Sequence, residues 1–144
     1  MTLREKLTAK ALKLLSYRPR SIHEIRFRLK QIPDSDKLID QVVKLLVEQD
    51  FLNDQKFATW WVDQRVTHRP RGNIALKQEL FQKGIDNHIV ESVLLSSKAE
   101  SSLAKRQLAS KSITLKSKAF KVLRSKGFTS QSILTAIDEL NLKE

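Results

Sequence analysis

The chain of 144 residues contains no cysteine and only three glycines and three prolines. The absence of cysteine excludes disulfides and thiolate zinc sites, and it favours a cytosolic location. No apolar stretch is long enough to cross a membrane, because clusters such as VVKLLV are interrupted by charge. The opening residues, MTLREKLTAKALKLL, mix acids and bases with apolar positions and lack a small-residue cleavage site. They predict an amphipathic helix and not a signal peptide.

Acidic residues are outnumbered and are missing altogether from one long stretch. The chain has 27 lysines and arginines against 16 acids, a net charge of +11. Basic and acidic side chains number 11 and 7 in residues 1–50 (+4), 6 and 5 in 51–95 (+1), and 10 and 4 in 96–144 (+6). Between Ser101 and Ile137 there are eight lysines and arginines and no acid. This excess indicates an anionic partner, and the alternative is an ordinary solvated helix face.

The hydrophobic pattern is helical throughout. Apolar residues recur every three or four positions, as in Leu3, Leu7, Ala11 and Leu14, and nothing alternates with period two for long. Nine such segments fall into three groups of three. The sequence therefore predicts an all-α protein of three tandem three-helix repeats that form an elongated, curved array. We expect the first repeat, with the N-terminal helix, over residues 1–52, the second over 53–96 and the third over 97–144.

The tripeptide Arg-Pro-Arg occurs twice, at residues 18–20 and 69–71, an offset of 51 that Leu29 and Leu80 share. A residue before proline avoids the α region, so each copy predicts a corner between two helices. Arginines at such corners cannot be buried cheaply, so we expect them to face solvent or a partner. The third group has Ile-Thr-Leu-Lys at residues 113–116 in place of this element.

Local signals mark where the helices begin and end. Ser21 and Glu24 have the spacing of a capping box, and Gly72 with Asn73 takes the cap role after the second corner. Asp54 is interpreted as an N-cap. Lys-Gly-Ile and Lys-Gly-Phe place Gly84 and Gly127 where a helix ends in the left-handed conformation.

No set of residues predicts catalysis. Asp34 and Asp54, followed by Lys56, fit the spacing of a metal-dependent nuclease motif, but that motif requires both acids on adjacent strands and these lie in a loop and at a helix start. The chain has no glycine-rich phosphate loop and no pair of histidines at helical spacing. We therefore assign no catalytic residue, metal ligand or cofactor, and expect a protein that is not an enzyme.

Trp60 and Trp61 are adjacent on a predicted helix. Their side chains point about 100° apart, so one is expected in the core and the other at an edge. The favoured role is packing one repeat against the next, and stacking on nucleic-acid bases is the alternative.

Taken together, these motifs resemble the RecX family, bacterial regulators of the RecA recombinase, from Ala11 to Leu140. In the first repeat and the link after it, the matching residues are Leu14, Leu15, Arg18, Arg20, Ser21, Glu24, Ile25, Leu29, Asp54, Phe57 and Ala58, with Asn53 in place of an aspartate. In the second and third repeats they are Arg65, Gly72, Glu79, Leu80, Lys83, Gly84, Ile85, Lys118, Leu123, Lys126, Gly127 and Phe128. One position departs: the family pattern has arginine where this chain has Ala75, and Lys77 is the candidate substitute.

The resemblance implies a non-enzymatic regulator that lies along the groove of the RecA–single-stranded DNA filament. It implies inhibition of RecA, and roles in recombination, DNA repair and the SOS response. The expected partners are the RecA filament, single-stranded DNA and also double-stranded DNA, with no membrane, for a cytoplasmic monomer. The alternative function is a sequence-independent DNA-binding module that acts through phosphate contacts.

Both functions require cations on the surface, and we expect fourteen residues to contact the filament or DNA. They are Arg18, Arg20, Arg26, Arg28, Arg65, Arg69, Arg71, Lys77, Lys83, Lys116, Lys118, Lys121, Arg124 and Lys126.

Overall fold

The computed structural model describes all residues from Met1 to Glu144 and contains nine helices and no strand. No helix combines the length and the apolar character needed to span a membrane. The helices are α1 (Leu3–Tyr17), α2 (Ile22–Leu29), α3 (Asp36–Glu48), α4 (Asp54–His68), α5 (Asn73–Gln82), α6 (Asn87–Val93), α7 (Ser97–Ser110), α8 (Lys116–Ser125) and α9 (Ser130–Glu139).

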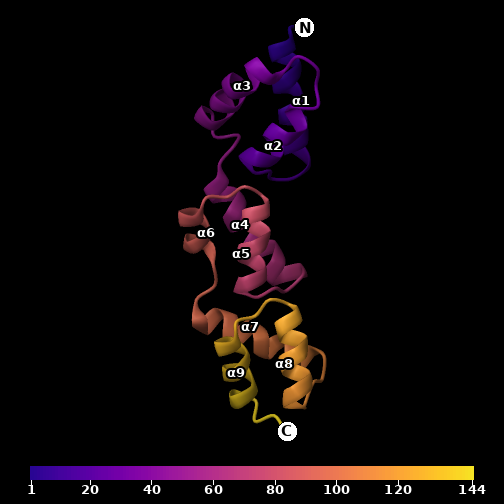
Figure 1. Ribbon diagram of the computed structural model, residues 1–144, viewed down its shortest axis with the longest axis vertical. Helices are drawn as coiled ribbons and strands as arrows, with labels where there is room; N and C mark the ends of the chain where they lie inside the picture. Colours follow the sequence, from indigo (N-terminus) through magenta and orange to yellow (C-terminus); the bar gives the residue numbers. More distant parts are fainter.

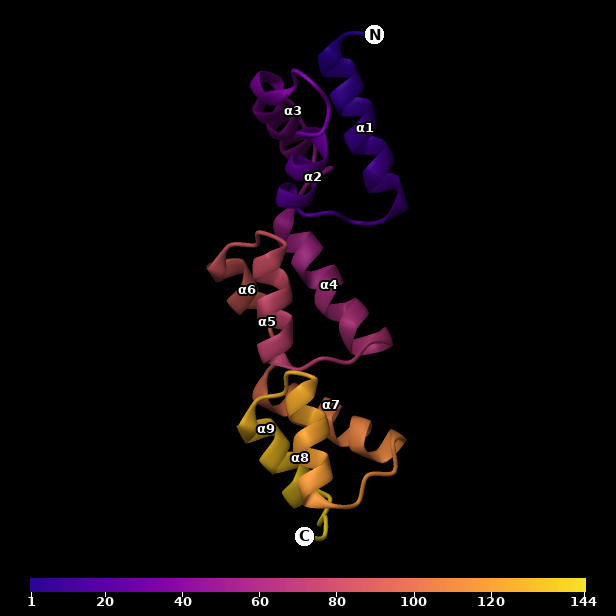
Figure 2. The same ribbon diagram turned by 45° about the vertical axis from the view of Figure 1, so that its right-hand side comes forward.

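The helices form three successive repeats along one axis. Figure 1 shows α1–α3, α4–α6 and α7–α9 following one another from the N-terminus at one end to the C-terminus at the other. The middle repeat is displaced to the left of both ends, and it remains so in the turned view of Figure 2, so the array is curved. The predicted all-α, elongated repeat array is confirmed.

Each repeat buries its own hydrophobic core. The three clusters lie within residues 7–52, 57–90 and 103–137. Val66 and Leu95 pack against both the second and the third cluster, so these two repeats share an apolar contact. Such an array is stabilised by its separate units together with the interfaces between neighbours.

The middle helices α2, α5 and α8 are aligned head to tail along the array (Figure 2). Gly84, just past α5, lies against His23 near the start of α2, and Gly127, just past α8, lies against Ala75 near the start of α5. Both glycines have positive φ, 76° and 82°, which confirms them as left-handed residues at helix ends. We call the contact of α2 with the end of α5 the first joint, and the contact of α5 with the end of α8 the second joint.

The start of α2 carries the predicted capping box. The Ser21 side chain accepts the amide of Glu24, and the Glu24 carboxylate accepts the amide of Ser21 at 3.0 Å. The stretch Arg18–Ser21 connects α1 to α2, so the first Arg-Pro-Arg forms the expected corner. This cap satisfies amides that a helix start leaves without partners.

The backbone amides at the start of α5 find their acceptors in the next repeat, because the N-cap residue Gly72 has no side chain to accept them. The amide of Gly72 donates to the carbonyl of Lys126 at 3.0 Å, and the amide of Ile74 donates to the carbonyl of Gly127 at 2.9 Å. Two carbonyls just past the end of α8 therefore accept amides at the start of α5.

Asp54 is not an N-cap, so that expectation was wrong. Asn53 is the N-cap, and its side chain accepts the amide of Lys56. Asp54 is the first residue of α4, and its Oδ1 accepts the amide of Ile22 at 2.9 Å across the first joint. Its carboxylate thus serves the start of α2 in the preceding repeat.

The expectation of one core and one edge tryptophan was also wrong, because Trp60 and Trp61 are both half-buried. Both pack against the core of the second repeat. Trp61 Nε1 donates to Glu79 Oε1 at 3.1 Å, within the same repeat. These contacts stabilise the second repeat itself.

Candidate nucleic-acid interface

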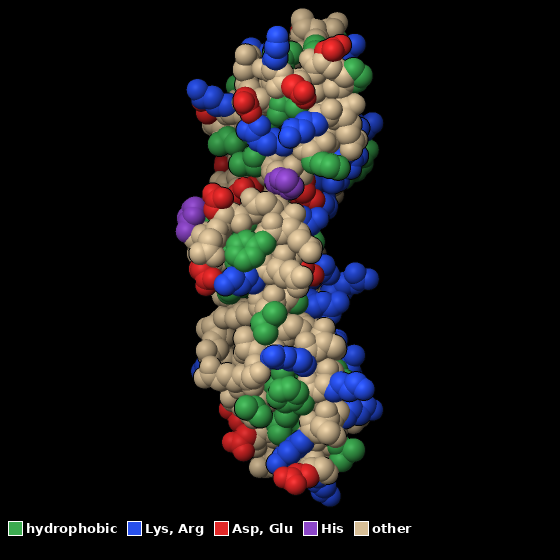
Figure 3. Space-filling model, in the orientation of Figure 1, with side chains coloured by type: hydrophobic (Ala, Val, Ile, Leu, Met, Phe, Trp, Pro, Cys, Tyr) green, Lys and Arg blue, Asp and Glu red, His purple; other side chains and the backbone are tan.

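Basic side chains gather along one edge of the array. Figure 3 shows Lys and Arg along the right-hand margin from the first repeat to the third, while the acids lie mainly toward the other side and the ends. Eight of the fourteen expected residues have no carboxylate within 4.0 Å, namely Arg20, Arg28, Arg69, Arg71, Lys118, Lys121, Arg124 and Lys126. The other six, Arg18, Arg26, Arg65, Lys77, Lys83 and Lys116, each lie in an ion pair.

The first joint is organised around the carboxylate of Glu24. Arg18 Nη2 lies 2.6 Å from Glu24 Oε2, and Lys83 Nζ reaches the same oxygen from the second repeat at 3.2 Å. Burial alone would raise the pKa of Glu24, but the hydrogen bonds from Arg18, the Ser21 amide and Lys83 outweigh it and lower the pKa. Two of the expected cations are therefore neutralised inside the fold.

Arg20 lies beside this group without joining it. Its Nε is buried and has no hydrogen-bond partner. Burial and the nearby charges of Arg18 and Arg28 lower its pKa, while Glu24 opposes them. Buried donors are normally satisfied, so this unpaired guanidinium nitrogen is an exception among the buried polar atoms of the fold.

Arg26 and Lys77 form equivalent ion pairs in successive repeats. Arg26 on α2 pairs with Asp40 on α3, and Lys77 on α5 pairs with Glu91 on α6 at 3.1 Å. Exposed pairs of this kind contribute little to stability, about 0 to 1 kcal/mol. Lys77, the candidate substitute for the arginine that the family pattern has at Ala75, therefore pairs with an acid of its own repeat.

Arg65 is held by an aromatic residue and an acid. Its Nε lies 3.0 Å from Glu79 Oε1, and its guanidinium lies 4.8 Å from the centre of the Trp61 ring. Lys83 Nζ lies 5.2 Å from the centre of the same ring. Both cations therefore lie against the Trp61 ring, and Arg65 also pairs with Glu79, so Arg65 contributes to the packing of the second repeat.

The second joint gathers cations that form no ion pair, because its buried acid, Glu100, binds the backbone amides of Asn73 and Thr129 instead. Lys126 Nζ donates to Gln107 Oε1 at 3.3 Å, and Arg71 precedes Gly72, whose amide binds the carbonyl of Lys126. Burial, together with the neighbouring Lys111 and Arg71, lowers the pKa of Lys126. Lys111 was not among the fourteen expected residues, although it belongs to the acid-free stretch that could have indicated it.

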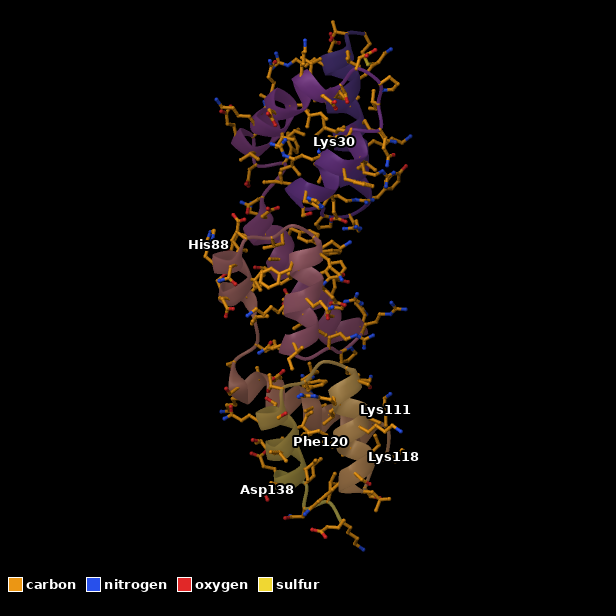
Figure 4. The ribbon with its side chains drawn as sticks, viewed as in Figure 1. Lys30, His88, Lys111, Lys118, Phe120 and Asp138 are labelled. Atoms are coloured by element: carbon orange, nitrogen blue, oxygen red, sulfur yellow. The ribbon has the colours of Figure 1, made fainter.

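The third repeat presents exposed cations on α8. Lys118 and Lys121 are exposed, and Arg124 Nη1 donates to Ser130 Oγ at 2.9 Å. Figure 4 shows Lys111 and Lys118 on the same side of this repeat. Lys116 is exposed too, but it pairs with Glu144 at 3.6 Å. The cations near α8 therefore continue the basic edge beyond the second joint.

The fold and this edge define a class of protein: an all-α repeat scaffold with an extended basic surface. Two family models match the chain, RecX first three-helix domain over residues 8–44 and RecX second three-helix domain over residues 53–94. Together they cover more than half of it. The chain belongs to the RecX family.

Curated relatives and a solved structure agree with this assignment. The chain is 31% identical to the regulatory protein RecX of Halalkalibacterium halodurans over 93% of its length, which covers 54% of that protein. It is 32% identical to the regulatory protein RecX of Bacillus subtilis over 91% of its length, which covers 53% of that protein. The chain thus spans about half the length of these relatives. The crystal structure of RecX from Lactobacillus salivarius matches with a TM-score of 0.81 and 27% identity, over 96% of this chain and 97% of that one.

Proposed function

We propose that this chain binds the RecA–single-stranded DNA filament and inhibits RecA, by binding and without a catalytic step of its own. The observation that carries the proposal is the row of cations without carboxylate partners along one edge of the array. The relatives' name, regulatory protein RecX, supports regulation as the outcome. A filament that contains DNA would place the protein in the cytoplasm.

Charge and shape both favour a long anionic partner. The net charge is +11, and the unpaired cations extend over all three repeats. DNA presents phosphates at regular spacing, and neutralising them releases counterions, which supplies affinity without base contacts. A repeat array contacts an extended ligand with several units at once.

The test measures the effect of the protein on the DNA-dependent ATPase of RecA. Sub-stoichiometric protein should lower the ATPase rate at concentrations where bare single strands are hardly bound. An ATPase rate that stays unchanged even when this protein saturates the DNA would contradict regulation of RecA. Affinity for a single-stranded oligonucleotide should also fall with salt at a log–log slope of about −4 to −6, from roughly five to eight phosphate contacts.

The second candidate is a DNA-binding module without a role for RecA, which the same row of cations favours. Phosphate contacts carry no sequence information, so such a module would bind all sequences alike, both single- and double-stranded. Tight binding to bare DNA together with an unchanged ATPase would favour it.

A further inference from the structure

The two joints are built from equivalent basic residues. Arg20 and Arg71 are both the last residue of an Arg-Pro-Arg corner, and Lys83 and Lys126 both precede the glycine that packs on the preceding repeat. Each joint therefore brings the corner arginine of one repeat toward the lysine of the next. The helix starts at both joints have their amides satisfied by the protein. Any further anion there would be bound by side chains.

The joints differ at one position, where an acid is present in the first and absent in the second. Glu24 and Ala75 are equivalent, 51 residues apart like the two corners. In the first joint Glu24 lies 3.2 Å from Lys83. In the second joint Lys126 donates only to the uncharged Gln107. Ala75 has no side chain that reaches it.

A third cation makes the second joint more positive still. Lys111 is the C-cap of α7, and its amide donates to the carbonyl of Gln107, the residue whose side chain accepts Lys126. The low pKa of Lys126, caused by burial and by the charges of Lys111 and Arg71, has the direction expected for a cation without an anion. Arg71 Nη1 donates only to the carbonyl of Pro70, at 3.3 Å, so most of its donors are free.

We propose that Arg71, Lys111 and Lys126 form a binding site for a phosphodiester group of a nucleic-acid backbone, and that Glu24 closes the equivalent site in the first joint. A phosphate oxygen between the three cations relieves their mutual repulsion, and the guanidinium fork of Arg71 suits its geometry. Nucleic acid as the source of the phosphate rests on the proposed function. Exposed Lys118 and Lys121 on α8 would continue the path of the strand.

The experiment supplies the second joint with the acid that the first joint has. Ala75→Glu introduces the carboxylate, and Ala75→Gln is the matched neutral control for steric effects at the contact with Gly127. Lys44→Gln on α3, exposed and outside the ion pairs, lowers the net charge by the same one unit as Ala75→Glu. Binding is followed by fluorescence anisotropy of a labelled single-stranded oligothymidine in a salt series.

We expect Ala75→Glu to reduce the magnitude of the salt slope by about 0.7 to 1.4, the loss of one or two phosphate contacts on a single strand. Ala75→Gln and Lys44→Gln should keep the wild-type slope. Glu24→Gln, which retains an acceptor for the Ser21 amide, should increase the magnitude by about 0.7 by opening the first joint. Equal slopes for Ala75→Glu and Ala75→Gln would overturn the site.

A second variant covers the case in which Ala75→Glu fails to fold, which circular dichroism would reveal. The double variant Arg71→Gln with Lys111→Gln removes two cations without adding bulk, and it should show the same loss of slope. An unchanged slope overturns the proposal. Competition by polyglutamate as strong as that by an unlabelled oligonucleotide of equal charge would assign the site to acidic peptides and overturn the phosphodiester.

The RecA ATPase assay separates this inference from the proposed function. If the wild-type protein inhibits RecA and Ala75→Glu binds the oligonucleotide normally, the site is rejected and the proposed function stands. A loss of oligonucleotide binding in Ala75→Glu, with RecA indifferent to the wild type, would reject the proposed function and leave the site standing.

Discussion

The carboxylate of Glu100 accepts the backbone amide of Asn73 at 2.7 Å, across the boundary between the second and third repeats. Glu100 is only 2% exposed, and it also accepts the hydroxyls of Thr129 and Ser132 at 2.6 Å each. One buried acid on α7 thus binds the start of α5 and the start of α9. Its charge is compensated by hydrogen-bond donors and by two helix N-termini.

Replacing this acid should loosen the second joint. Glu100→Ala removes the acceptor for four buried or half-buried donors, so we expect the free energy of unfolding to fall by roughly 3 kcal/mol or more. Urea denaturation followed by circular dichroism measures it. Glu91→Ala, which removes only the exposed partner of Lys77, is the control and should cost no more than about 1 kcal/mol. Similar losses in both variants would show that the buried network contributes little.

Glu24 should make the free energy of unfolding depend on pH in the acidic range. Its pKa is lowered in the folded state, so its contribution is present in full above the unfolded value of about 4.3 and is lost as the pH falls through the folded value. The stability advantage of wild type over Glu24→Gln should therefore shrink on acidification from pH 7 to about 3.5. Urea midpoints of both proteins at the two pH values test this. An advantage that stays constant with pH would show that the charge of Glu24 is immaterial.

The sequence predicted most of the local structure because those signals lie close together along the chain. The capping box at Ser21, the corners and the left-handed glycines each involve a few neighbouring residues. The joints could not be predicted in the same way. Asp54, the first residue of α4, serves the start of α2, whereas Glu100, the fourth residue of α7, serves the start of α5. Each acid accepts an amide at the start of the middle helix in the preceding repeat. The two acids stand at different positions within their own repeats, so a constant sequence offset does not relate them.

The candidate site was predicted by residue type, and its ion pairs were not. Arg18 and Lys83 belong to a basic pattern in the sequence, yet both contact Glu24 in the fold. Lys83 lies 59 residues from Glu24, and only the packing of the second repeat on the first brings them together. Net charge therefore indicated an anionic partner without separating free cations from neutralised ones.

Gly127 should not tolerate a side chain. Its φ is +82°, and a Cβ there would lie 2.3 Å from the Cβ of Ala75 and 2.6 Å from its backbone nitrogen. Gly127→Ala would therefore combine left-handed strain of about 1 to 2 kcal/mol with displacement of the second joint. We expect a fall in the thermal midpoint that exceeds the fall for Ala109→Gly, an exposed helical control that costs about 1 kcal/mol. A smaller fall for Gly127→Ala than for Ala109→Gly would show that the second joint accommodates a side chain without loss of stability.

Removing the third repeat should weaken the second repeat more than the first. In a fragment of residues 1–95, the amides of Gly72, Asn73 and Ile74 lose the acceptors that Lys126, Glu100 and Gly127 provide. Water replaces these acceptors, so the net loss is about 1 kcal/mol for each hydrogen bond, to which the exposure of apolar surface at the boundary adds.

The first repeat has its own core and keeps its contact with α4 in such a fragment. Because an array unfolds according to the stability of its units and interfaces, we expect two urea transitions in the fragment, with the second repeat melting first. Trp60 and Trp61 both lie in the second repeat, so tryptophan fluorescence should report the earlier transition and circular dichroism both. Both probes could instead report a single transition at the urea midpoint of the full chain. That result would show that the second joint does not stabilise the second repeat.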